Sequence, residues 1–127
     1  MAVELKYELV ETEATDGNGT ALYRIRALKD FSDVKKGDLG GYVEGYHNLT
    51  QEGDAWIYDE AKVFGKSLVA DNAKVTGRVR VLGHALVKDD AILEGTVGGY
   101  TMFVYDRVIL DKDTHIYGDN GRAIKIS

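Results

Sequence analysis

A six-residue repeat that begins at Gly53 constrains the fold of this chain more than any other feature. The first position of each repeat is glycine or aspartate, the third is small or β-branched, and the fifth is aliphatic. The third positions are Ala55, Ala61, Ser67, Ala73, Val79, Ala85 and Ala91. The fifth positions are Ile57, Val63, Val69, Val75, Val81, Val87 and Leu93.

This pattern predicts short strands joined by corners. Two inward residues that flank one outward residue are typical of a strand, and a glycine or aspartate suits the corner that follows. Three repeats would close one triangular coil of about 18 residues, and successive coils would stack by parallel pairing. The sequence therefore predicts an all-β, single-stranded parallel β-helix of somewhat under four coils.

The repeat continues towards the C-terminus with one irregularity. Residues 95–99 (GTVGG) are interpreted as a repeat that is one residue short. Later third positions are Met102, Val108 and Thr114, and later fifth positions are Val104, Leu110 and Ile116. Residues 123–126 are predicted to form a last strand after a turn at 119–121, so the β-helix with its C-terminal strand spans 53–127.

Residues 1–52 lack the repeat and are predicted to form an N-terminal hairpin and cap. Apolar and polar residues alternate over 5–9 and again over 23–27, and turn-forming residues fill 15–20 between them. The end of a stack of coils exposes unpaired backbone groups and apolar core, so it needs a covering segment.

Composition excludes several classes of function. The net charge of −5 disfavours nonspecific nucleic-acid binding. The chain has no cysteine, and its three histidines do not cluster, so we expect no disulfide, no metal site and no cofactor. No signal peptide or membrane span is recognisable, which favours a cytoplasmic location without membrane contact.

Three segments carry a resemblance to a known family: GDLGGY at 37–42, the pair Asn48-Leu49, and GDAW at 53–56. From Tyr23 to about Leu93 the chain resembles YdcK-like hexapeptide-repeat proteins, which are common in phages and prophages. The resemblance implies a left-handed β-helix with an N-terminal cap.

The fourth position of each repeat points outward, and every third repeat should share a face. One predicted face carries an apolar strip of Leu68, Leu86 and Phe103, which is typical of an interface. The strip could contact another copy of the chain, contact a foreign partner, or lie under the cap or tail. A weaker candidate face carries Trp56, Ile92 and Ile109, interrupted by Lys74; Trp56 is either a binding anchor or covered by the hairpin.

The remaining face is basic and carries Lys62, Arg80 and His115, with Arg78 beside them. One interpretation is ordinary ion pairing between coils, which contributes little to stability. The other is a small anion or phosphate site, or a contact with a partner.

Histidine is the residue to consider for catalysis, since hexapeptide acyltransferases, which have a similar fold, use a histidine base between the subunits of a trimer. The chain offers His47, His84 and His115, all at corners or on outward positions. None has an evident carboxylate partner in the sequence, so we expect no catalytic residue and no enzyme.

The sequence thus favours a non-catalytic, protein-binding solenoid that forms a homo-oligomer and binds a host protein. The resemblance to phage proteins suggests an inhibitor of a host defence system such as a CRISPR effector nuclease, located in the cytoplasm of a bacterial host cell. One alternative is an acyltransferase-like enzyme acting as a trimer, with His84 or His115 at a subunit boundary. A second alternative is a structural, self-assembling module.

Overall fold

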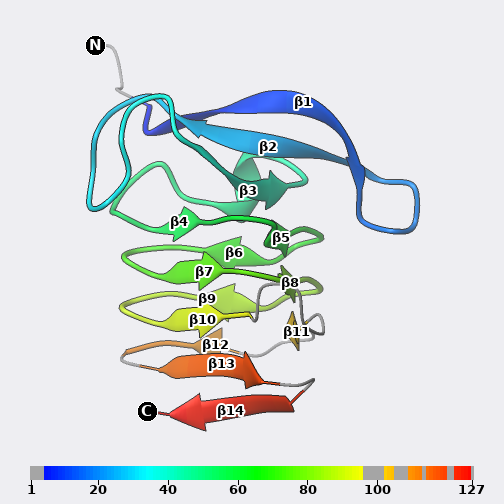
Figure 1. Cartoon of the computed structure of the whole chain (residues 1–127), viewed down its shortest axis with the longest axis vertical. Coiled ribbons are helices and arrows are strands. Elements are labelled where there is room, and N and C mark those ends of the chain that lie inside the picture. Colours follow the sequence, from blue (N-terminus) through cyan, green and yellow to red (C-terminus); the bar gives the residue numbers. More distant parts are fainter. Residues whose placement is uncertain (1–4, 96–101, 105–108, 113, 120–121, 127) are drawn as a thin grey trace.

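A computed structural model describes residues 5–95, 102–104, 109–112, 114–119 and 122–126. Within these ranges the chain is all-β, with a 3-10 turn η1 (Tyr46–Asn48) and no α-helix. Figure 1 shows flat coils stacked on one another, with the N-terminal strands across one end of the stack and the C-terminal strand at the other. No helix in the described ranges is long and apolar enough to cross a lipid bilayer.

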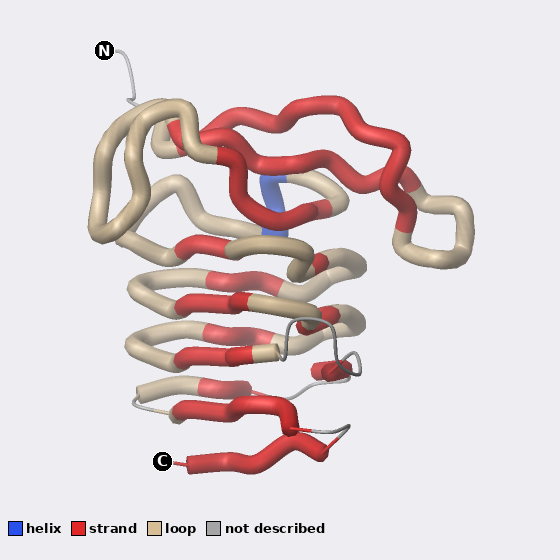
Figure 2. Tube along the Cα trace, in the orientation of Figure 1, coloured by secondary structure: helices blue, strands red, loops and turns tan. Residues whose placement is uncertain are grey.

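The N-terminal strands are β1 (Tyr7–Thr15), β2 (Ala21–Ala27) and β3 (Leu39–Val43). β1 and β2 form the antiparallel hairpin that the alternating sequence predicts, and β2 also pairs antiparallel with β3. β3 then pairs parallel with β5 (Lys62–Val63), so the hairpin sheet continues into the stack of coils (Figure 2). β3 thereby covers the backbone edge of the first coil at β5.

The coils place their short strands in three sheets. The first sheet continues from β5 through β8 (Val79–Val81) to β11 (Met102–Val104). The second contains β4 (Trp56–Ile57), β7 (Lys74–Thr76), β10 (Ile92–Glu94), β13 (His115–Asp119) and β14 (Arg122–Ile126). The third contains β6 (Leu68–Val69), β9 (Leu86–Val87) and β12 (Ile109–Leu110).

Pairing between the described strands of the coils is parallel, and the C-terminal strand β14 pairs antiparallel with β13. Trp56 pairs with Lys74, Lys62 with Arg80 and Leu68 with Leu86, so each strand meets the strand three repeats later. This arrangement of all-β parallel sheets is compatible with the predicted β-helix.

The third and fifth positions of the seven repeats form the core. Their exposed fraction is at most 1 %, as the repeat predicts. Further along the chain Val104, Leu110 and Thr114 are also buried. Val108 lies outside the described residues.

The first positions of the seven repeats all adopt a left-handed backbone conformation, with φ between 57° and 76°. Glycine reaches this region without strain, and aspartate tolerates it better than most residues. The aspartates also join consecutive coils. Asp71 Oδ2 accepts a hydrogen bond from the Asp89 amide at 3.1 Å, and Asp89 Oδ2 accepts one from the Lys112 amide at 2.9 Å.

The predicted faces are wrong after residue 95, because β11, β12 and β13 pair with other strands than the repeat count predicts. Met102 pairs with Val79 and Phe103 with Arg80, so β11 lies on the first sheet, on the face that the repeat count had given to residues 95–99. A physical reason is visible in the sequence: the fifth position of GTVGG is Gly99, which has no aliphatic side chain to bury. The described strands after this segment therefore lie one face of the coil away from the face that the repeat count predicts.

Three site predictions change as a result. Phe103 follows Lys62 and Arg80 on the first sheet and does not lie beside Leu86. Ile109 takes that place on the third sheet, paired with Leu86. His115 pairs with Ile92 on the second sheet, away from the basic residues.

Candidate functional site

The shift brings His115 next to a carboxylate. His115 begins β13 and Glu94 ends the neighbouring strand β10, and the Nε2 atom of His115 lies 3.3 Å from the Oε2 atom of Glu94. The His115 and Glu94 side chains are 36 % and 52 % exposed, respectively. A carboxylate at this distance restrains the orientation of the imidazole ring, and a general base needs such positioning.

Sequence reasoning missed Glu94 as the partner of His115. The two residues belong to different coils, and their proximity depends on the number of coil steps between them. Counting residues 95–99 as a repeat placed His115 beside Arg80. One sequence feature could have indicated the pair: the fifth position of residues 95–99 is a glycine and not an aliphatic residue.

The other two histidines have different surroundings. His84 is exposed before β9. His47, in η1, has its Nε2 atom 2.9 Å from the Gly65 carbonyl oxygen and 4.0 Å from Glu44 Oε2. His47 therefore connects the N-terminal region to the first coil, and its ring nitrogen already has a backbone partner.

An apolar ladder, defined here as Leu68, Leu86 and Ile109, runs along the third sheet on strands β6, β9 and β12. Leu68 and Leu86 are partly buried, and Ile109 is 60 % exposed. The ladder keeps two of the three residues of the predicted strip and replaces Phe103 by Ile109. Ile92 is partly buried on the second sheet, between Lys74 and His115.

Trp56 is covered by the N-terminal cap, which is one of the two alternatives left open by the sequence. Its exposed fraction is 2 %. The Tyr7 and Phe31 rings meet the Trp56 ring edge-on, with centroids 6.3 Å and 5.2 Å away. In this arrangement Trp56 stabilises the junction of cap and coil, and its ring is not accessible as a binding anchor.

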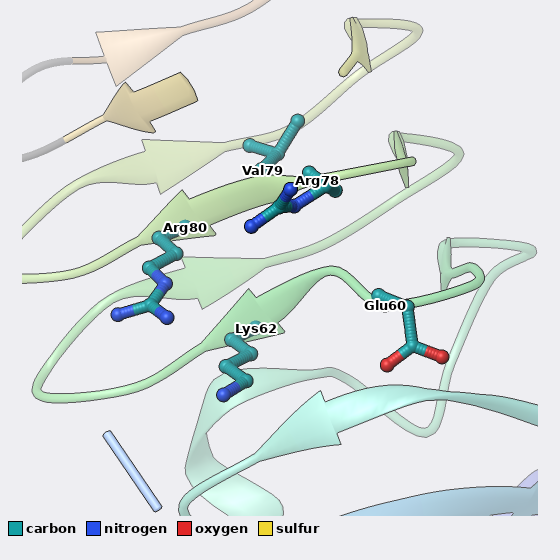
Figure 3. A pocket seen from close by; sticks show the side chains of 5 residues that line it. All are labelled: Glu60, Lys62, Arg78, Val79 and Arg80. Atoms are coloured by element: carbon teal, nitrogen blue, oxygen red, sulfur yellow. The ribbon is translucent and has the colours of Figure 1, made fainter. Parts of the chain in front are cut away.

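A basic pocket of about 190 Å³ lies on the first sheet. Figure 3 shows Lys62 and Arg80 projecting side by side from neighbouring strands, with Arg78 and Glu60 also lining the pocket. Burial lowers the pKa of Lys62 and the nearby Arg80 guanidinium lowers it further, against smaller opposite effects of Glu60 and Asp16. The three cationic residues of the predicted anion site therefore line one pocket. No group of three or more metal-ligating side chains occurs within the described ranges.

Repeated coils, buried alternate positions and left-handed corners agree with a hexapeptide-repeat architecture. The chain is 32 % identical over 99 residues to a protein of Escherichia coli strain K12 described as "Uncharacterized acetyltransferase YdcK". The alignment covers 72 % of this chain and 30 % of that relative, so the chain spans less than a third of the relative's length. This similarity supports a hexapeptide-repeat family, and no family model matches the chain.

The comparison corrects the functional expectation. The relative is described as an acetyltransferase, which points to a possible enzyme and contradicts the prediction of a non-catalytic inhibitor of host defence. The similarity favours the alternative of an acyltransferase-like protein instead. It provides no support for an origin in a phage or prophage.

Proposed function

We propose that this chain is an acyltransferase-like hexapeptide-repeat protein that moves an acyl group from an acyl-coenzyme A to a hydroxyl or amine acceptor. The observation that carries the proposal is the 32 % identity to a protein described as an acetyltransferase. The stack of parallel coils agrees with it, because the fold resembles that of hexapeptide acyltransferases. We infer a left-handed coil from the same resemblance.

His115 is the proposed general base. Its imidazole would take the proton of the acceptor while the acceptor oxygen or nitrogen attacks the thioester carbonyl carbon. The carbon–sulfur bond then breaks, and the coenzyme sulfur takes the proton back from the imidazolium. Glu94 would stabilise that imidazolium from 3.3 Å. General-base catalysis of this kind contributes about 10²–10⁴-fold to a rate.

The proposed active form is a trimer whose subunits meet along the apolar ladder. An exposed apolar strip on a regular surface usually marks an interface, and Ile109 at its end is 60 % exposed. The ladder and the histidine are close in the chain, since β12 leads through the corner at Lys112 into β13. A subunit packed on the ladder would border the His115 side of the coil and could complete a cleft there.

Turnover of acetyl-coenzyme A tests this proposal. Because the chain has no cysteine, a thiol reagent detects the released coenzyme without background from the protein. Acetyl-coenzyme A is supplied with a panel of primary alcohols and amines, and hydrolysis is followed in parallel. We expect His115→Asn to lower the rate at least about 100-fold and Glu94→Gln about 10-fold.

His84→Asn is the matched control, because His84 is an exposed histidine in a neighbouring coil. We expect it to retain the wild-type rate within about twofold, since surface substitutions away from a site have small effects. An equal loss in the His84 and His115 variants would contradict the assignment of the base. The absence of thiol release with every acceptor, and with water, would contradict the function.

A further inference from the structure

We propose that the basic pocket formed by Lys62, Arg78 and Arg80 binds a phosphate group, either free or carried by a larger ligand. This site lies on the first sheet, whereas His115 and Glu94 lie on the second. The proposal therefore goes beyond the acyl-transfer function and does not depend on it.

The fold brings the three cationic side chains together from two coils. Lys62 on β5 pairs with Arg80 on β8, and Arg78 immediately precedes β8 (Figure 3). The pocket between them has a volume of about 190 Å³. One water molecule occupies about 30 Å³ in the liquid, so the pocket has room for a tetrahedral oxyanion and its bound water.

The charge balance of the pocket favours an anion. Its lining contains three cationic residues and one carboxylate, Glu60, although the whole chain carries a net charge of −5. Burial lowers the pKa of Lys62, and the Arg80 guanidinium lowers it further, against smaller opposite effects of Glu60 and Asp16. Asp16 is also engaged elsewhere, because its Oδ1 atom accepts hydrogen bonds from the amides of Asn18 at 2.7 Å and Thr20 at 3.1 Å.

The β1–β2 hairpin helps to hold the site in shape. Lys62 Nζ donates a hydrogen bond to the Thr15 carbonyl oxygen at 3.2 Å and lies 5.9 Å from the centroid of the Tyr42 ring. Arg80 approaches the hairpin loop at Gly17, where an added Cβ would come within 3.8 Å of the guanidinium. Side chains that are positioned before binding lose less conformational entropy when a ligand arrives.

The side-chain chemistry points to phosphate rather than to a carboxylate. Guanidinium groups bind phosphate oxygens with two parallel hydrogen bonds, and the lysine adds a compact positive charge. A phosphate monoester carries about −1.5 to −2 charges at neutral pH, which suits a pocket with three cations better than a single negative charge does. A small site in an otherwise acidic chain favours a discrete phosphorylated molecule over a long polyanion.

Calorimetric titration with pyrophosphate and, separately, with coenzyme A tests this site. We expect at least one of the two to bind the wild type, and Lys62→Gln to weaken that binding at least about 10-fold through loss of a charged hydrogen bond. Lys74→Gln is the matched control: Lys74, like Lys62, is a partly buried lysine that begins a strand of the coil, but it lies on the second sheet. We expect the Lys74→Gln variant to bind the same ligand with an affinity within about twofold of wild type.

The two ligands distinguish the source of the phosphate. Lys62-dependent binding of pyrophosphate supports a site for a free phosphate compound, and Lys62-dependent binding of coenzyme A alone supports a site for the phosphates of a larger ligand. Arg80→Gln repeats the test on a second side chain if Lys62→Gln does not fold. Failure of both ligands to bind, or an equal loss in Lys74→Gln, would overturn the proposal. Failure of pyrophosphate alone has no bearing on turnover at His115.

Discussion

At the scale of single residues, the corners determine which amino acids the repeat accepts. A left-handed φ explains why only glycine and aspartate occupy the first positions of the seven repeats. Where a glycine lies against the next coil, a second constraint is the room available for a Cβ atom. A Cβ built on Gly77 would overlap the carbonyl oxygen of Gly95, whereas a Cβ on Gly37 would meet nothing within 4 Å.

Gly77→Ala should therefore destabilise the chain more than Gly37→Ala. Both positions have a left-handed φ, 70° and 94° respectively, so both variants lose about 1–2 kcal/mol from backbone strain. The overlap with Gly95 adds to this cost only at Gly77. Urea unfolding of the two variants measures the difference, and equal losses would mean that the coils do not approach each other at this corner.

Lys6 is a residue whose role the sequence does not reveal. Its side chain is fully buried, and Nζ donates to the carbonyl oxygens of Ala55 at 2.7 Å and Gly53 at 3.3 Å. Burial lowers the pKa of Lys6 from its ordinary value of 10.5 to about 8, with Asp54 opposing and Lys29 reinforcing the shift. The lysine thus supplies hydrogen bonds to the first coil while its charge is poorly solvated.

This shift makes stability depend on pH in a definite direction. Because the pKa of Lys6 is lower in the folded state, the unfolded state binds more protons between about pH 8 and 10.5. We expect the free energy of unfolding of wild type, relative to Lys6→Met, to increase from pH 7 to 9.5. Measurements stop there because Tyr7 and Tyr58, whose pKa values are raised by burial, act in the opposite direction above pH 10. A constant difference between the two proteins would contradict the burial of a charged Lys6.

At the scale of elements, the repeat predicts strands and corners well and relative register less well. Inward residues could be predicted because alternate positions repeat seven times without exception. The hairpin could be predicted from its alternation and its turn residues. The faces that carry Phe103, Ile109 and His115 could not be predicted. An irregular segment changes the face of every residue after it, and the strand pairing is needed to determine how many repeats have passed.

Val75→Asp tests the core of the stack. Val75 is fully buried in the middle of β7, which pairs with both β4 and β10. An unpaired carboxylate there should cost more than about 3 kcal/mol and abolish cooperative unfolding. The neighbouring change Lys74→Asp, on the outward side of the same strand, should leave a cooperative transition. Circular dichroism during heating distinguishes the two, and a cooperative transition for Val75→Asp would contradict the assigned core.

At the scale of the whole molecule, function was less predictable than fold. The same coils suit binding, catalysis and assembly, and the residues that distinguish these uses lie on outward positions that the repeat leaves free. The pair of His115 and Glu94 becomes visible only when β10 and β13 are known to be neighbours. The three cations of the basic pocket were predictable together, since all three lie within the regular repeats and Lys62 and Arg80 occupy the same position three repeats apart.

The proposed trimer predicts that a charge on the apolar ladder changes the molecular mass in solution. Ile109→Glu should convert trimers to monomers, because a carboxylate buried in an apolar interface has no partner. Leu39→Glu is the control, since Leu39 is also an exposed aliphatic residue, 52 % exposed, but lies in the cap. Light scattering gives the masses. A wild-type monomer, or an unchanged trimer for Ile109→Glu, would contradict the proposed interface.

The measurement that tests the proposed function most directly is a calorimetric titration of wild-type protein with acetyl-coenzyme A, combined with its mass by light scattering. We expect saturable binding of about one acetyl-coenzyme A per subunit, with a Kd below about 1 mM, in the range usual for enzyme substrates. Binding of free coenzyme A and of the acetylated form by a trimer would agree with acyl transfer. A folded protein that binds neither form at millimolar concentration would contradict it.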